Sequence, residues 1–127
     1  MICDSNILIY AAEPGDTLCL PYARRPDAMI ASVTRIEVLG FPKFGLLSVQ
    51  RQKELHTLVT SIIELPLDEE IIQRAIQLRQ QKSMKLGDAI IAATALEYGV
   101  PLVTRNEGDF KHIAGLQIIN PFAVSSP

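Results

Sequence analysis

The chain has 127 residues, of which 48% are hydrophobic and 20% charged, and its formal net charge is −2. This composition is typical of one globular domain, which we expect to span residues 1–127, and it excludes an intrinsically disordered chain. The weak negative charge does not exclude nucleic-acid binding, because a site built from several carboxylates lowers the net charge even where basic residues surround it.

Short apolar runs that predict strands alternate with amphipathic runs that predict helices along the whole chain. In chain order we expect strand 1–3, helix 6–12, a short helical piece at 17–23, strand 28–33, helix 34–41, helix 48–60, strand 62–65, helix 68–81, helix 89–96, strand 102–104 and strand 117–119. The helix at 89–96 is apolar on nearly every side, which predicts burial, and Gly99 is placed to end it. This alternation predicts an α/β fold with three α/β/α layers around a mainly parallel sheet of four or five strands.

No apolar stretch reaches the about 18 residues that a membrane-spanning helix needs. Asp4 follows the first three residues, which leaves no basic start for a signal peptide. We therefore expect a cytoplasmic protein without membrane contact. Cys3 and Cys19 lack a CxxC spacing, and Cys3 lies in an apolar run, so free buried thiols are expected rather than a disulfide.

Four acidic residues adjoin the ends of short apolar segments, namely Asp4, Glu37, Asp88 and Asp109. They are far apart in sequence, but a parallel sheet brings the carboxyl ends of its strands to one edge, where the ligand crevice normally lies. We therefore expect the four carboxylates to cluster. Hard carboxylate oxygens are the ligands that Mg²⁺ prefers, so the cluster predicts a divalent-metal site.

Each of these acids also has a purely structural explanation. Thr34 and Glu37 match the S/T-x-x-E capping box, and Asp88 lies near a helix start, where a carboxylate favours the helix dipole. Asp4 and Asp109 are placed to cap short helices. Taken singly, capping explains each residue best. As a group they fit a metal better, because a carboxylate beside an apolar helix is poorly solvated and a cation supplies the missing partner.

The sequence around these acids contains four motifs: Asp4-Ser5-Asn6-Ile7-Leu8-Ile9-Tyr10, Ser32-Val33-Thr34-Arg35-Ile36-Glu37-Val38-Leu39, Gly87-Asp88-Ala89-Ile90-Ile91, and Leu102-Val103-Thr104-Arg105-Asn106 with Asp109-Phe110. Together, in this order and at these spacings, they resemble the motifs of PIN-domain ribonucleases. Within that family the chain is most similar to VapC-type toxins of prokaryotic toxin–antitoxin pairs. No single motif is specific, but the ordered set is, and it covers nearly the whole chain.

The resemblance implies an endoribonuclease that binds Mg²⁺ or Mn²⁺, hydrolyses RNA and is inhibited by a cognate antitoxin. Catalytic and metal-binding roles carry over onto Asp4, Glu37, Asp88 and Asp109, and supporting roles onto Ser5, Asn6, Thr34, Thr104 and Asn106. Ser5 stands where many relatives have Thr, which keeps the hydroxyl. The residue types suit the reaction, because carboxylate-bound Mg²⁺ can activate water and neutralise charge on a phosphodiester.

RNA that approaches an acidic site needs cations nearby. Arg35 and Arg105 are the nearest in sequence to the acids, followed by Lys85 and Lys111. Each could equally be an ordinary solvated surface charge.

The resemblance also implies a homodimer. The segment after residue 38 supports it, because it holds more apolar side chains than one helix and loop normally bury. These side chains are Leu39, Phe41, Phe44, Leu46 and Leu47.

Three other classes of protein are alternatives. A degenerate PIN-like scaffold that binds RNA or protein without cleavage would have the same fold, but such proteins tend to lose acids that this chain keeps. A haloacid-dehalogenase-type phosphatase needs a second Asp two residues after the first, where this chain has Asn6, and a receiver domain needs paired acids near Asp4. His56 and His112 have no zinc-ligand spacing, and the scattered glycines form no phosphate loop. The degenerate scaffold is the main alternative.

Overall fold

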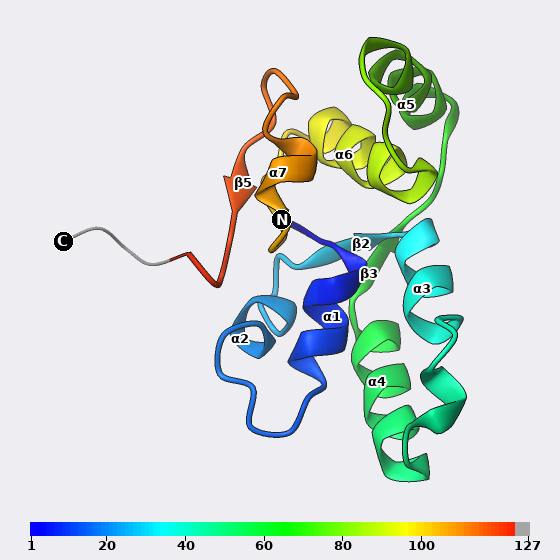
Figure 1. Ribbon diagram of the computed structural model, residues 1–127, viewed down its shortest axis with the longest axis vertical. Helices are drawn as coiled ribbons and strands as arrows, with labels where there is room; N and C mark the ends of the chain where they lie inside the picture. The colour runs from blue at the N-terminus through cyan, green and yellow to red at the C-terminus, as the bar shows by residue number, and fades with distance from the viewer. Residues whose placement is uncertain (124–127) are drawn as a thin grey trace, which may run out of the picture.

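A single five-stranded sheet organises the molecule (Figure 1), whose computed structural model describes residues 1–123. The strands are β1 (Ile2–Cys3), β2 (Met29–Ala31), β3 (Ile63–Leu65), β4 (Leu102–Val103) and β5 (Ile118–Ile119). Their order across the sheet is β3-β2-β1-β4-β5, and every neighbouring pair is parallel. The predicted α/β class and parallel sheet are confirmed. Residues 124–127 of the expected domain lie outside the described part of the chain.

Helices cover both faces of this sheet. They are α1 (Ser5–Ala11), α2 (Leu20–Ala23), α3 (Ser32–Leu39), α4 (Val49–Ser61), α5 (Glu69–Gln81), α6 (Leu86–Tyr98), α7 (Glu107–Phe110) and the 3₁₀ helix η1 (Phe44–Leu46). In Figure 1, α1 to α4 lie on one side of the sheet, and α5, α6 and α7 lie on the other. Within residues 1–123, no helix combines the length and the apolar composition needed to cross a membrane.

The strands contribute side chains to two separate cores, because successive side chains of a strand point to opposite faces of the sheet. Ile2 and Leu102 pack with residues of α5, α6 and α7, whereas Cys3 and Val103 pack with residues of α1 to α4. The continuous stretch from Ala89 to Ala95 in α6 is buried, as its apolar composition predicts. Gly99 ends α6 with φ 63°, a left-handed conformation that glycine adopts without steric cost.

The start of α3 differs from the prediction. The second strand was expected to continue to Val33, but it ends at Ala31 and the helix begins at Ser32. The Ser32 hydroxyl donates to Glu64 Oε2 at 3.0 Å and to the Leu65 carbonyl at 3.2 Å, which attaches the helix start to β3. A partner more than 30 residues away decides this boundary, so the apolar run alone predicts it wrongly.

The thiols of Cys3 and Cys19 are free and buried, as expected. Burial raises the pKa of Cys3 to about 12 and that of Cys19 to about 11. Both thiols are therefore uncharged and unreactive at neutral pH.

The apolar segment that starts at the last residue of α3 is partly buried by the domain itself. Four of its five large side chains, Leu39, Phe41, Phe44 and Leu47, pack against the core beneath α1 and α4. The rings of Phe41 and Phe44 meet edge to face at 5.9 Å between centroids. Leu46 alone of the five is largely exposed, at 83%. The domain itself therefore covers part of the surface of four of these five side chains, and the oligomeric state stays a prediction.

Candidate active site

The direction of the chain through the sheet changes at β1, which lies between β2 and β4. The chain leaves β1 into α1 on one face and leaves β4 into α7 on the other. Parallel sheets bind ligands in the crevice at such a switch point, beyond the carboxyl ends of the strands. Asp4 and Thr104, the residues that directly follow β1 and β4, lie at this crevice.

Asp4 is only 5% exposed and is held by two hydrogen bonds. The Thr104 hydroxyl donates to Oδ2 at 2.5 Å, and the Ile7 amide donates to Oδ1 at 2.9 Å. The Asn106 amide donates to Thr104 Oγ1 at 3.1 Å, which orients that hydroxyl toward Asp4. Asp4 is thus the N-cap of α1, so the capping interpretation is correct for this residue, and its carboxylate also lies at the switch point.

Glu37 is held from α1 rather than within its own helix. The Ser5 hydroxyl donates to Glu37 Oε1 at 2.7 Å. The capping box expected for Thr34 and Glu37 is not formed, because α3 begins at Ser32 and its cap position is Ala31. The Glu37 carboxylate lies against the first turn of α6, where a Cβ added to Gly87 would stand 2.7 Å from Oε2. Gly87 therefore leaves the room that Glu37 occupies.

Asp88 and Asp109 provide the opposite side of the site from two further helices. Burial raises the pKa of Asp88, and the charge of Asp109 raises it further, while Lys85 opposes the shift. Burial also raises the pKa of Asp4, against the hydrogen bonds from Thr104 and Ile7. Without a metal ion, the ionised forms of both carboxylates are therefore poorly solvated.

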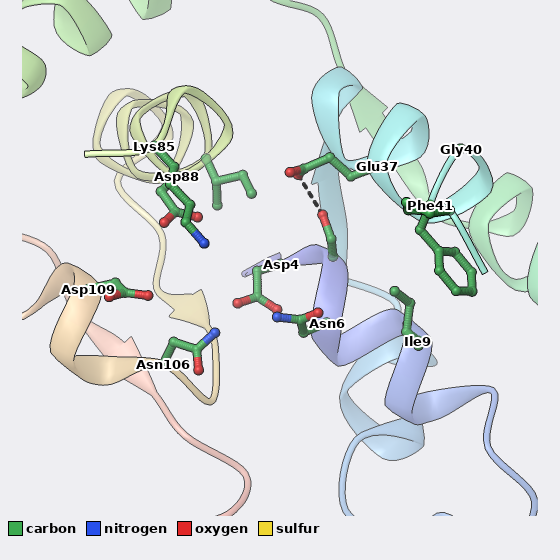
Figure 2. Close-up of a pocket in the computed structure, with 13 residues that line it drawn as sticks. Asp4, Asn6, Ile9, Glu37, Gly40, Phe41, Lys85, Asp88, Asn106 and Asp109 are labelled. Carbon is green, nitrogen blue, oxygen red and sulfur yellow. Dashed lines mark hydrogen bonds between the residues drawn. The ribbon is translucent and has the colours of Figure 1, made fainter. Parts of the chain in front are cut away.

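A cavity of about 390 Å³ collects these side chains. Of the expected site residues, its lining includes Asp4, Ser5, Asn6, Glu37, Lys85, Asp88, Asn106 and Asp109. Figure 2 shows Glu37 from α3 and Asp88 from α6 on opposite sides, with Asp4 between them and Asp109 and Asn106 on the side of Asp88. The carboxylates from four separate segments thus face one space.

The two arginines expected near RNA have other partners. Arg35 forms an ion pair with Glu64, with 2.6 Å between Nε and Oε1. Arg105 donates to the Tyr10 hydroxyl at 3.0 Å, and its guanidinium lies 4.4 Å from the centre of the Phe122 ring. Neither arginine lines the acidic cavity, whereas Lys85 does.

Two expected supporting residues also lie outside the cavity lining. Thr104 stands behind Asp4 and donates a hydrogen bond to its carboxylate. Thr34 is completely buried in α3, and its hydroxyl has no hydrogen-bond partner among the residues from 1 to 123. The sequence interpretation also missed Gly87 as a spacer for Glu37. A glycine directly before an acid at a helix start was the available signal.

The donor set suits Mg²⁺ or Mn²⁺, since all four acids offer hard oxygen ligands. In the described part of the chain, no three His, Cys, Asp or Glu side chains are close enough to form a ready-made ligand cluster. This is compatible with Mg²⁺, which commonly takes one or two carboxylates directly and keeps several waters. Burial disfavours the charged forms of Asp4 and Asp88 and raises the pKa of both, and a bound cation would offset that cost.

Comparison with known proteins gives the same picture. Residues 1–116 match the family model described as the PIN domain. A toxin–antitoxin complex from Klebsiella pneumoniae contains a chain 29% identical to this one, with a TM-score of 0.77 and coverage of 97% of this chain and 98% of that one. Among curated protein sequences, none matches.

More distant structures share the fold. A chain of VapBC2 from Rickettsia felis, bound to a promoter DNA fragment, is 20% identical with a TM-score of 0.78, over 94% of this chain and 96% of that one. A chain of FitAcB from Neisseria gonorrhoeae is 23% identical with a TM-score of 0.74, over 97% and 99%. Because the family model spans most of the sequence and the parallel sheet carries its acids at the switch point, the chain belongs to the PIN-domain family.

Proposed function

We propose that this chain is a divalent-metal-dependent endoribonuclease and the toxin of a VapC-type toxin–antitoxin pair. The observation that carries the proposal is the convergence of Asp4, Glu37, Asp88 and Asp109 on one cavity at the switch point of the sheet. Membership of the PIN-domain family supports a nuclease, and the acidic donor set supports Mg²⁺ or Mn²⁺.

In this proposal the four acids would hold the metal ion, directly or through its bound waters, and burial raises the pKa of two of them, Asp4 and Asp88. A bound ion would supply an activated water and neutralise charge on the phosphate. Thr104 fixes Asp4 and Ser5 fixes Glu37, so both carboxylates present oriented oxygens. Glu37 is exposed, and we assign its Oε2 to accept the proton of the attacking water.

The direct test is cleavage of RNA by the purified chain. We expect cleavage in millimolar Mg²⁺ or Mn²⁺ and none in EDTA. The alternative is a PIN-like scaffold that binds RNA or protein without cleaving, and the lack of a ready-made ligand cluster within residues 1–123 favours it. A mixed-sequence RNA pool that stays intact in both metals, with a chain that is folded, would support the scaffold.

Metal binding should stabilise the protein in a pH-dependent way. Because the pKa values of Asp4 and Asp88 are raised in the native state, that state binds more protons than the unfolded chain between the ordinary value of 3.8 and the raised values. The free energy of unfolding of the metal-free protein therefore rises as the pH falls through this window. Protons compete with the ion there, so the gain from Mg²⁺ shrinks as the metal-free protein becomes more stable.

Thermal melting across pH, with Mg²⁺ or with EDTA, measures both effects. At a metal concentration about 100 times Kd, the expected stabilisation near neutral pH is about 2.7 kcal/mol. The control is KCl at matched ionic strength, which should give no such gain. A Mg²⁺ effect that is absent, or equal at every pH, would contradict a metal held by these two carboxylates.

A cognate antitoxin is the protein partner we propose, and the cytoplasm, where cellular RNA is exposed, is the location. The similar chain from Klebsiella pneumoniae belongs to a structure described as a toxin–antitoxin complex, which supports this partner. Co-expression should yield a stable complex in which RNA cleavage is suppressed.

We also propose a homodimer, supported by exposed apolar side chains on three consecutive elements. Ile36 in α3 is 70% exposed, Leu46 in η1 83% and Val49 in α4 68%. Light scattering should give twice the 14.0 kDa mass of one chain. Leu46→Glu combined with Ile36→Glu should shift the equilibrium to monomer, because a buried charge in an interface lacks a partner. Ile76→Glu, on the exposed face of α5, is the control, and a monomeric parent at micromolar concentration would contradict the dimer.

A further inference from the structure

A second cavity, of about 240 Å³, adjoins the acidic one. The two cavities share Lys85, Asp88 and Asp109 as lining residues. The second cavity continues past them to Lys82 and His112. The two cavities are therefore neighbours that share one wall, and they are not unrelated sites.

The charge of the lining changes from one cavity to the other. The acidic cavity carries four carboxylates and, among its described lining residues, Lys85 as its cation. The second cavity adds Lys82, the imidazole of His112 and the hydroxyl of Ser83, and it adds no further carboxylate from the described chain. The side chain of Lys85 lies close enough to Asp88 for its charge to act on that carboxylate. The lining thus changes from four carboxylates and one lysine in the acidic cavity to two carboxylates and two lysines in the second cavity.

The loop that carries Lys82 and Lys85 is held in place by the fold. The Lys82 amide donates to the Leu78 carbonyl at 3.2 Å, at the end of α5. Arg79 Nε donates to the Met84 carbonyl at 3.3 Å, and the Met84 side chain packs against the core around α6. The two lysines are therefore presented by an anchored connection between two helices that each have 13 residues.

We propose that this second cavity binds the phosphate next to the scissile one in single-stranded RNA. The strand then runs from the acidic cavity across Asp88 and Asp109 to Lys82, Lys85 and His112. The proposal rests on the proposed function, since it takes RNA as the substrate of the acidic cavity. A metal ion neutralises only the phosphate that it contacts, so the neighbouring phosphate needs cations from the protein. A strand that follows two adjoining cavities must be flexible, as unpaired RNA is.

The test is binding of a fluorescently labelled single-stranded RNA, measured by anisotropy with Ca²⁺ in place of Mg²⁺. Lys82→Ala should raise Kd about three- to fivefold, as expected for one exposed ion pair. The slope of log K against log salt should become shallower by about 0.7, which corresponds to one lost phosphate contact on a single strand. Lys82→Arg should restore affinity, and Lys82→Gln repeats the loss if the alanine variant folds poorly.

The control removes the same charge elsewhere. Lys53 lies on α4, on the other face of the sheet, and lines neither cavity. Lys53→Ala should leave Kd and the salt slope within error of the parent. Equal weakening by Lys82→Ala and Lys53→Ala would mean general attraction and would overturn the subsite, as would a parent chain that binds no RNA. A chain that binds RNA through Lys82 but cleaves none with Mg²⁺ contradicts the nuclease and leaves this subsite standing.

Discussion

Asp88→Asn abolishes RNA cleavage, with an expected loss of about 10³-fold or more, while the metal-free protein stays as stable as the parent or becomes more stable. Burial and the charge of Asp109 both raise the pKa of Asp88, so its ionised form is unfavourable in the native state. The asparagine removes that charge and keeps the size of the side chain. In the described residues Asp88 makes no capping hydrogen bond that the change would break.

This variant separates catalysis from helix stabilisation, provided that a matched control is measured beside it. Glu70 is an exposed acid in the first turn of α5, a helix as long as α6. Glu70→Gln should cost a few tenths of a kcal/mol through the helix dipole and leave cleavage unchanged. Single-turnover cleavage and chemical denaturation in EDTA give both readouts. Parental cleavage by Asp88→Asn would falsify the nuclease site, and a stability loss like that of Glu70→Gln would assign Asp88 to the dipole.

The effect of Asp4→Asn is harder to interpret than that of Asp88→Asn, although both residues belong to the same site. Asp4 caps α1 through Oδ1 and accepts from the Thr104 hydroxyl through Oδ2. Asn caps a helix about as well as Asp, but its side-chain amide can place an NH₂ group where Oδ2 accepts, so the substitution alters local hydrogen bonding and chemistry together. Capping and metal binding are therefore not exclusive for this residue, although the sequence presents them as alternatives.

We expect Gly87→Ala to lower RNA cleavage by about 10²-fold without loss of stability. The added Cβ would stand 2.7 Å from Glu37 Oε2 and 3.2 Å from Oε1, so the carboxylate must move. Movement breaks its alignment with the Ser5 hydroxyl, and a displacement of about 1 Å at a reacting group can cost 10²-fold in rate. The fold tolerates the change, because Glu37 is exposed and alanine favours helix over glycine by up to about 1 kcal/mol.

Gly87→Ala is informative because the cleavage rate is expected to fall while the free energy of unfolding is expected to stay the same or rise. Gly45→Ala is the control, because a Cβ there meets nothing within 4 Å and should leave cleavage unchanged. Thermal melting and initial cleavage rates measure the two effects. Normal activity in Gly87→Ala would show that the position of the Glu37 carboxylate does not matter for the reaction.

The acids could be grouped from sequence because parallel strands all end at one edge of the sheet. Asp4 needed only to follow a strand for this rule to place it correctly. The capping box of Thr34 and Glu37 failed because that motif is local, whereas the start of α3 is fixed by Ser32 and its contact with β3. At such a helix start, a contact with a distant strand sets the boundary, and a local sequence pattern does not reveal it.

The two arginines expected near RNA lie outside the cavity lining for a related reason. Arg35 pairs with Glu64, which is 29 residues away in sequence, and Arg105 donates to Tyr10, which is 95 residues away. Sequence proximity to an acid does not reveal these distant partners, and RNA binding by either arginine stays a prediction. Lys85 alone of the three lines the cavity, because it directly precedes α6, the helix that carries Asp88.

The hydrogen bond between Asp4 and Thr104 joins residues 100 positions apart, which has a consequence during synthesis. A ribosome that has made only the first three quarters of the chain has produced Asp4, Glu37 and Asp88 but neither β4 nor Asp109. The central strand β1 then lacks one of its two neighbours, and the acidic cavity lacks a wall. The nascent chain therefore emerges without an assembled active site, and the nuclease that we propose would arise only near the end of translation, when an antitoxin can already be present.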